Sequence, residues 1–145
     1  MERIKSFTID HNSHPKGFYL SNEMNGIFTY DLRFKVPNEG DYLSNAAIHT
    51  IEHLFATVIR NSKVKEKVVY FGPMGCRTGF YLLLNNINKE EAKSIMIICF
   101  NKCLELDTIP GASKEECGNY LEHSLDGAKA EIKEYLKVLI QDKKG

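Results

Sequence analysis

The 145-residue chain lacks the features that mark several classes of protein. It has no tryptophan and only 4 prolines, and no Pro-, Gly- or Ser-rich tract divides it. Lys and Arg total 19, as do Asp and Glu, so the net charge is +0. A chain without excess positive charge carries no electrostatic footprint for nucleic acid or anionic lipid. The sequence therefore predicts one compact domain over residues 1–145 that binds neither of these partners.

Long hydrophobic runs are also absent. The longest unbroken run is Ile95 to Phe100, whereas a membrane-spanning helix needs about 20 apolar residues. The first residues, MERIKSFTIDH, lack the apolar region of a signal peptide. We therefore expect a cytoplasmic protein, in which the 4 cysteines are free thiols or metal ligands rather than disulfides.

Hydrophobic periodicity predicts an α+β fold, with helices packed on an antiparallel β-sheet. The clearest strand spans Ile27 to Val36, where apolar and polar residues alternate. Shorter strands are predicted at Ser6 to Asp10, Phe18 to Leu20, Lys67 to Phe71 and Phe80 to Leu84.

Three helices are predicted. One follows Asn88, whose spacing to Glu91 is that of a capping box. Another lies near the C-terminus, with Asp126 as its expected N-cap. The third spans Ser44 to Arg60 and carries the candidate chemistry.

In that third helix, His49, Glu52 and His53 lie opposite the apolar stripe. Glu52 is the only charged residue from Ser44 through Ile59, whereas a solvated face of that length normally carries several. We therefore expect this face to be covered by the rest of the domain or by a second subunit. Two histidines four residues apart suit a divalent metal, with Glu52 beside it as a general base, although a structural pair without metal fits the spacing equally well. The order H-x-x-E-H is also the inverted form of the zinc-peptidase motif.

The cysteines divide into two kinds. Cys99 and Cys103 lie on the apolar stripe of their helix and are predicted to pack in the core. Cys117, in the polar segment EECGNY, is the best candidate for a third metal ligand. Cys76 lies among glycines in GPMGCRTGF, which favours a tight turn with an accessible sulfur. Arg77 or another nearby cation would then favour the thiolate, although an incidental turn cysteine is the commoner case.

The remaining histidines and one arginine have ordinary interpretations when taken singly. His11, His14 and His123 are typical of surface or hydrogen-bonding positions. Arg33, on the polar face of its predicted strand, is typical of a solvated charge.

Five segments, taken together, resemble the S-ribosylhomocysteine lyase (LuxS, autoinducer-2 synthase) family. They are SFTIDH, YDLRFKVPN, HTIEHLFATVIR, PMGCRTGFYL and CGNYLEHSLDGAK, in the family's order, and they span most of the chain. HTIEH and PMGCRTGFY are far more specific jointly than either is alone. Where the family commonly has Asp-x-Ser before PMGC, this chain has Tyr70, Phe71 and Gly72.

The resemblance implies an enzyme that cleaves S-ribosylhomocysteine to homocysteine and 4,5-dihydroxy-2,3-pentanedione, the precursor of autoinducer-2. It also implies Fe(II) as the native metal, often replaced by Zn(II) or Co(II), and a homodimer with active sites at the subunit interface. Matched by motif position, the expected metal ligands are His49, His53 and Cys117, and the expected acid/base pair is Glu52 and Cys76. The expected substrate-binding residues are Ser6, His11, Arg33 and, near the homocysteine end, Arg60.

Two other functions fit parts of the same pattern. The first is a metallopeptidase of the H-x-x-E-H type, which normally takes a carboxylate as its third ligand. The second is a non-catalytic, zinc-stabilised binding protein in which Cys76 is a fourth ligand and closes a His₂Cys₂ shell.

Overall fold

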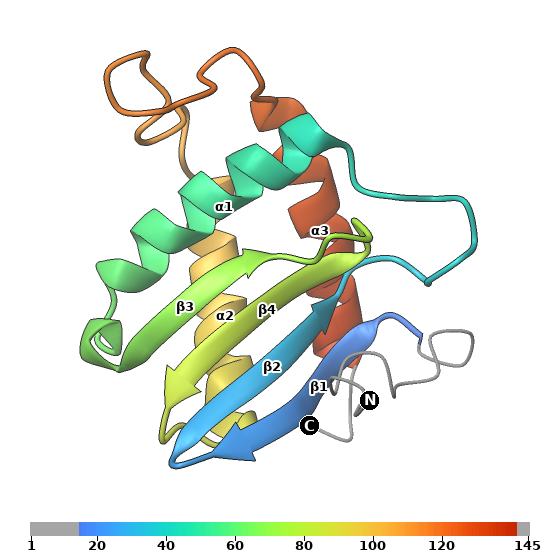
Figure 1. Ribbon diagram of the computed structural model, residues 1–145, viewed down its shortest axis with the longest axis vertical. Helices are drawn as coiled ribbons and strands as arrows, with labels where there is room; N and C mark the ends of the chain where they lie inside the picture. Colours follow the sequence, from blue (N-terminus) through green and yellow to red (C-terminus); the bar gives the residue numbers. More distant parts are fainter. Residues whose placement is uncertain (1–14, 142–145) are drawn as a thin grey trace, which may run out of the picture.

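The computed structural model describes residues 15–141, which form one α+β domain (Figure 1). This confirms the fold class that the hydrophobic pattern predicts. The described strands are β1 (Gly17–Met24), β2 (Ile27–Arg33), β3 (Val68–Pro73) and β4 (Gly79–Asn85). The helices are α1 (Asn45–Arg60), α2 (Lys89–Leu104) and α3 (Leu125–Gln141), with a short 3-10 helix, η3 (Lys65–Lys67), before β3.

The strands form one antiparallel sheet in the order β1-β2-β4-β3. Asn25 and Gly26 connect β1 to β2 with positive φ angles of 54° and 83°, which suit a tight hairpin between antiparallel strands. The strands predicted from Phe18 and Phe80 are confirmed with longer bounds. The strand predicted from Lys67 is also confirmed, but it begins one residue later, at Val68, because Lys67 belongs to η3. The strand predicted at Ser6 to Asp10 lies outside the described residues.

β2 ends at Arg33, three residues before the predicted end. The backbone N–H groups of Phe34 and Lys35 both donate to the carbonyl oxygen of Thr78, at 2.8 and 2.9 Å. Because two successive residues share one acceptor, the regular ladder stops there. The alternating pattern continues past this point, so it could not reveal the break.

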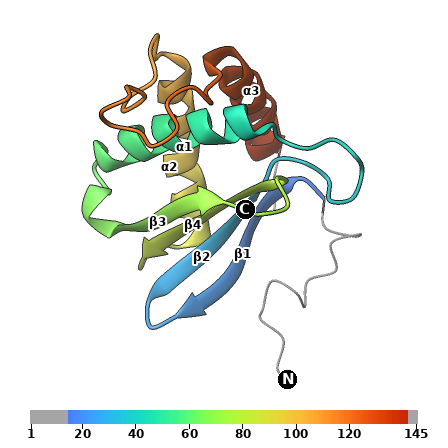
Figure 2. The same ribbon diagram turned by 45° about the horizontal axis from the view of Figure 1, so that its top comes forward.

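All three helices lie on one side of the sheet (Figures 1 and 2). α1 runs beside β3, while α2 and α3 cover the sheet from behind in the view of Figure 1. The core between the layers is rich in aromatic rings. Phe100 of α2 packs against Phe55 of α1 and Tyr135 of α3, with ring centroids 4.6 and 5.8 Å apart. This shared core fixes the position of α1, which carries the two histidines of HTIEH.

The beginnings of α1 and α2 follow the expected chemistry. The Ser44 side chain accepts a hydrogen bond from the Ala47 N–H at 3.1 Å, so Ser44 is the N-cap of α1. The Asn88 side chain accepts from the Glu91 N–H at 2.9 Å, which confirms Asn88 as the N-cap of α2.

The predicted N-cap of α3 is wrong. The helix begins at Leu125, and it is Ser124 whose side-chain oxygen accepts from the Gly127 N–H, at 3.0 Å. Asp126 instead lies in the first turn, where its negative charge interacts favourably with the helix dipole. Ser and Asp are both good caps, so the sequence alone did not distinguish two positions so close together.

Cys99 and Cys103 are core residues, as predicted, with exposed fractions of 2% and 0%. Burial raises the pKa of the Cys99 thiol to about 11 and that of Cys103 to about 12. Neither sulfur is therefore available as a thiolate near neutral pH. Within residues 15–141, no helix combines the length and the apolar character needed to cross a bilayer.

The polar face of β2 is not solvated, contrary to the simple expectation for Arg33. Arg33 is 1% exposed and Asp31 is 0% exposed. The guanidinium of Arg33 donates from Nε and Nη2 to the two carboxylate oxygens of Asp31, at 3.1 and 2.6 Å. A charge can be buried only when it is paired, and the sequence pattern did not show that this strand face would be covered.

Candidate metal centre

α1 presents His49 and His53 on the side opposite its buried stripe. Ile51, Leu54 and Phe55 are fully buried against the core, whereas both histidines are half-buried. Four residues bring the side chains one turn apart on a helix, and the two imidazole rings lie with centroids 4.8 Å apart. The helix geometry alone therefore places two imidazole ligands side by side.

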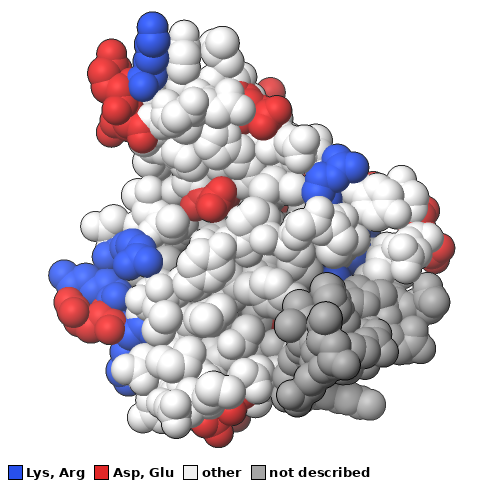
Figure 3. Space-filling view, viewed as in Figure 1, with Lys and Arg blue, Asp and Glu red and all other residues white. Residues whose placement is uncertain are grey.

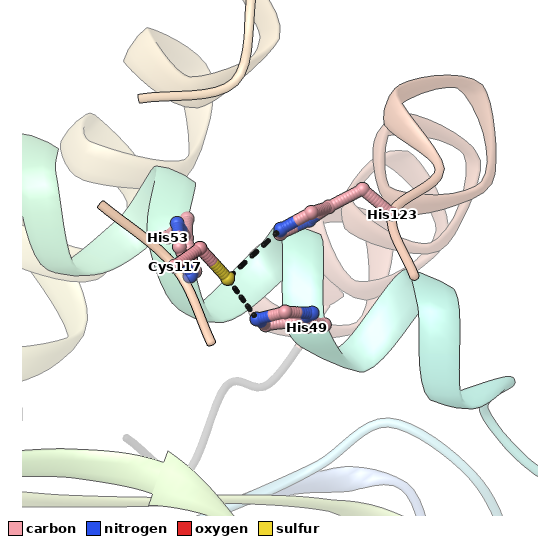
Figure 4. A group of neighbouring side chains, drawn as sticks. All are labelled: His49, His53, Cys117 and His123. Atoms are coloured by element: carbon pink, nitrogen blue, oxygen red, sulfur yellow. Dashed lines mark hydrogen bonds between the residues drawn. The ribbon is translucent and has the colours of Figure 1, made fainter. Parts of the chain in front are cut away.

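The irregular segment 105–124, between α2 and α3, brings two more ligand groups to this pair (Figure 4). Cys117 Sγ lies 3.3 Å from His49 Nε2 and 3.8 Å from His123 Nε2. One ligand atom from each of His49, His53, Cys117 and His123 lies within 4.8 Å of every other. These four residues are referred to below as the ligand cluster.

The dimensions of the ligand cluster suit one metal ion. Tetrahedral Zn²⁺ binds nitrogen at about 2.0–2.1 Å and sulfur at about 2.3 Å, so its ligand atoms lie roughly 3.3–3.8 Å from one another. The two sulfur–nitrogen distances in the cluster fall in this range. The cluster can therefore hold one divalent cation without a large movement of its side chains.

Hydrogen bonds on the far side of the rings orient the imidazoles. His49 Nδ1 lies 2.8 Å from the Glu122 carbonyl oxygen, and His53 Nδ1 lies 2.8 Å from the Pro110 carbonyl oxygen. A carbonyl can only accept, so both Nδ1 atoms carry the hydrogen and donate. Each Nε2 then presents its lone pair to the ligand cluster, as a metal-bound histidine requires.

His123 is the member of the cluster that sequence reasoning missed. Its ring stacks on His49, with centroids 3.8 Å apart, and its Nδ1 lies 2.9 Å from Thr50 Oγ1. Thr50 Oγ1 also accepts from the backbone N–H of Ser124, the N-cap of α3. Burial lowers the pKa of His123, and the neighbouring imidazoles of His49 and His53 lower it further. Both effects favour the neutral imidazole, which is the form of histidine that binds a metal.

The position of His123 in the sequence did not identify it as a ligand candidate. His123 follows Cys117 by six residues and immediately precedes the capping serine of α3. Its side chain is directed toward α1, where its Nδ1 lies 2.9 Å from Thr50 Oγ1. Only the packing of α3 on α1 reveals this, so periodicity within one segment could not.

A cleft of about 540 Å³ opens beside the ligand cluster. Glu52 lines it together with His49, His53 and Cys117, so the structure brings the predicted general base to the predicted ligands. The other lining residues come from the same helix and from segment 105–124: Ala56, Thr57, Pro110, Gly111, Glu116 and Gly118. The charge-poor face of α1 is thus partly covered by this segment of the same chain, which is one of the two arrangements expected.

Cys76 lies elsewhere in the single chain. It is exposed in the turn between β3 and β4, beside a separate cavity of about 340 Å³ lined also by Tyr42, Arg77 and Thr78. Its sulfur lies 3.1 Å from Thr78 Oγ1. Cys76 is not a member of the ligand cluster, so the His₂Cys₂ shell of the binding-protein alternative does not form within the described chain.

Two of the predicted substrate-binding residues, Arg33 and Arg60, are among the described residues. Arg33 is buried near the Cys76 turn, where its Nη1 donates to Thr78 Oγ1 at 2.7 Å. Arg60 is exposed at the last turn of α1. Ser6 and His11 lie outside the described residues.

Comparisons with known proteins agree on one family. A family model described as S-Ribosylhomocysteinase (LuxS) matches residues 4–145. The chain is 49% identical to the S-ribosylhomocysteine lyase of Borreliella afzelii (strain PKo), over 96% of this chain and 93% of that protein. It is 42% identical to the S-ribosylhomocysteine lyase of Phocaeicola vulgatus, over 97% of this chain and 92% of that protein. It is 40% identical to the S-ribosylhomocysteine lyase of Clostridium beijerinckii, over 97% of this chain and 92% of that protein.

Proposed function

The chain belongs to the S-ribosylhomocysteinase (LuxS) family, and we propose that it cleaves S-ribosyl-L-homocysteine to L-homocysteine and 4,5-dihydroxy-2,3-pentanedione, the precursor of autoinducer-2. The observation that carries this proposal is the ligand cluster beside Glu52 in an open cleft, in a chain whose relatives are named as lyases of this substrate. A metallopeptidase is not favoured, because the cluster draws its further ligand groups from a cysteine and a histidine rather than a carboxylate.

His49, His53 and Cys117 are the proposed metal ligands, with two Nε2 atoms and one sulfur directed toward one another. Nitrogen and sulfur donors accept Fe(II), Co(II) and Zn(II), and we propose Fe(II) as the native ion. When bound, such a cation supplies Lewis-acid stabilisation of negative charge on substrate oxygens. Three protein ligands would leave one position for the sugar, and His123, the fourth member of the cluster, is proposed to stay outside the ligand set while its Nδ1 contacts Thr50.

The reaction needs two groups that alternate between acid and base. Breaking the carbon–sulfur bond requires a leaving group β to a carbonyl, whereas the carbonyl of the substrate starts at ribose C1 and must first migrate to C3. Each migration removes a proton from one carbon and returns a proton to its neighbour. We assign these transfers to the Glu52 carboxylate and the Cys76 thiolate. The final step expels homocysteine as a thiolate.

We propose that the substrate extends along α1, the helix that carries His49 and His53. His49, His53 and Arg60 lie on one face of α1, at positions i, i+4 and i+11. The rise of 1.5 Å per residue places Arg60 about 10 Å along the axis from His53. A substrate whose sugar docks at the metal can then extend its amino-acid carboxylate toward the Arg60 guanidinium.

The remaining substrate-binding residues, Ser6, His11 and Arg33, are proposed to hold the sugar hydroxyls in register. Because Arg33 is only 1% exposed, we propose that it also acts on the substrate site indirectly, through its hydrogen bond to Thr78. Tyr70, which is 50% exposed on β3, stands at the segment where the family commonly has Asp-x-Ser.

A homodimer is part of the proposal, because Cys76 and the ligand cluster line separate cavities of one chain. At an interface between two subunits, the Cys76 cavity of one subunit can lie against the ligand-cluster cleft of the other. The outer face of the sheet supports such an interface. Figure 3 shows a broad area with few charged groups over β3 and β4, and Val69 and Tyr70 of β3 are 46% and 50% exposed. A cytoplasmic location is also proposed, since all four cysteines are free thiols.

The deciding experiment measures thiol release from S-ribosylhomocysteine by the metal-loaded protein. We expect the metal-loaded protein to release homocysteine. A chelator should abolish this release, and the H49A variant should show none. No thiol release by fully loaded protein would overturn the proposal. Turnover of a panel of peptides instead would favour the metallopeptidase.

A further inference from the structure

A buried polar chain leads to the sulfur of Cys76. Asp31 binds the guanidinium of Arg33 through two hydrogen bonds, and Arg33 Nη1 donates to Thr78 Oγ1 at 2.7 Å. Thr78 Oγ1 in turn lies 3.1 Å from Cys76 Sγ. Arg33 and Thr78 are each 1% exposed, while Cys76 is exposed. These hydrogen bonds therefore lead from the protein interior to the exposed sulfur of Cys76.

The direction of these hydrogen bonds follows from the chemistry of the groups. A guanidinium has only donors, so Thr78 Oγ1 must accept from Arg33. The single hydroxyl hydrogen of Thr78 then remains for another acceptor, and the Cys76 sulfur lies within reach. The nearby cation polarises this hydroxyl, which makes it a better donor and a poorer acceptor. The arrangement therefore lets the Thr78 hydroxyl donate a hydrogen bond to the Cys76 sulfur.

The backbone holds Thr78 rigidly in this position. Its carbonyl oxygen accepts from the N–H groups of both Phe34 and Lys35 at the end of β2. The next residue, Gly79, passes so close to β2 that a Cβ there would overlap the Leu32 carbonyl oxygen. A hydroxyl held by its own backbone and by Arg33 loses little further freedom when it binds the sulfur.

Among the described residues, the charged side chain that lines the Cys76 cavity is that of Arg77. No Asp or Glu from the described residues lines its cavity. Arg77, from the same turn, adds a positive charge, and its guanidinium reaches the Leu43 carbonyl and the Tyr42 ring. On the adjoining segment, the carboxylate of Asp41 pairs with Lys35, and Glu39 is exposed away from the lining.

We propose that Thr78 is a positioning residue for Cys76: its hydroxyl, held by Arg33, donates to the sulfur and keeps it as an oriented thiolate that can take a proton from the substrate. The inference rests on the proposed function for the role of Cys76 in turnover. It does not rest on that function for the state of the sulfur, so the two can be tested apart.

The test measures alkylation of Cys76 by iodoacetamide in the metal-loaded, full-length protein. Peptide mass spectrometry follows the modification of Cys76 separately from the other cysteines, between pH 5 and pH 9. In T78V, we expect the rate at pH 7 to fall about tenfold and the half-maximal rate to move to higher pH, because a hydrogen bond to a charged group is lost. T78S keeps the hydroxyl and should react like the wild type.

A matched control is T29V, which removes a hydroxyl from β2 of the same sheet and should leave the rate unchanged. If T78V does not fold, as judged by its unfolding midpoint, T78A takes its place. In turnover assays, T78V should lower kcat with little change in KM, and T78S should restore it.

Alkylation of T78V or T78A at the wild-type rate and pH midpoint would overturn the inference, as would a T78S variant that behaves like T78V. If T78V is alkylated more slowly than the wild type, and the wild type itself has no lyase activity, the inference is supported and the proposed function is refuted. If T78V is alkylated at the wild-type rate and the wild type is an active lyase, the inference is refuted and the proposed function is supported.

Discussion

The ion pair between Asp31 and Arg33 supports a quantitative prediction about stability. The two side chains are 0% and 1% exposed, and two hydrogen bonds of 3.1 and 2.6 Å join them. The D31N substitution keeps the size of the side chain but leaves the guanidinium charge buried without its counter-ion. Breaking a buried pair in this way costs about 3–5 kcal/mol of unfolding free energy. For a domain of this size, that corresponds to a fall in Tm on the order of 10 °C.

The assay is urea unfolding of wild type and D31N, followed by circular dichroism. All samples need the same protein concentration, because the stability of a homodimer depends on it. The exposed pair Glu134–Lys137 provides the control, since E134Q should change the unfolding free energy by no more than about 0.5 kcal/mol. The double variant D31L/R33L, which removes both charges, should be closer to the wild type than D31N is. A D31N protein within about 1 kcal/mol of the wild type would refute the reasoning.

The other predictions concern the site. H49A should lose both bound metal and turnover, whereas C76A should keep the metal and lose turnover; elemental analysis with the thiol-release assay tests this, and metal loss in C76A would contradict it. E52Q should keep the metal and lose turnover by at least about a hundredfold, as expected for a proton-transfer residue, and near-normal steady-state rates would remove Glu52 from the mechanism. In iodoacetamide labelling at pH 8, Cys76 should react in the folded protein, while Cys99 and Cys103, with pKa values raised by burial to about 11 and about 12, should react only after unfolding. Labelling of either buried cysteine in folded protein would show that the core opens there.

The sequence predicted what depends on local spacing. The period of apolar residues revealed the helix of HTIEH and the side on which His49 and His53 lie, and the polar setting of Cys117 distinguished it from the two core cysteines. These features are properties of one turn or one short segment, so no knowledge of the rest of the fold was needed.

What the sequence did not predict depends on contacts between distant segments. His123 joins the ligand cluster only because α3 packs on α1, and Arg33 is buried in an ion pair with Asp31 rather than solvated. Cys76 and the ligand cluster line separate cavities of one chain, and the spacing of residues in the sequence does not show how far apart these cavities lie. Each of these outcomes requires the relative positions of elements, which periodicity does not contain.

The two carbonyl groups that orient the imidazoles come from opposite ends of one irregular segment, Pro110 near its start and Glu122 near its finish. Attachment of that segment to α1 and alignment of the two rings are therefore the same event. A cation that binds both imidazoles and the Cys117 sulfur would therefore depend on the packing of this segment against α1.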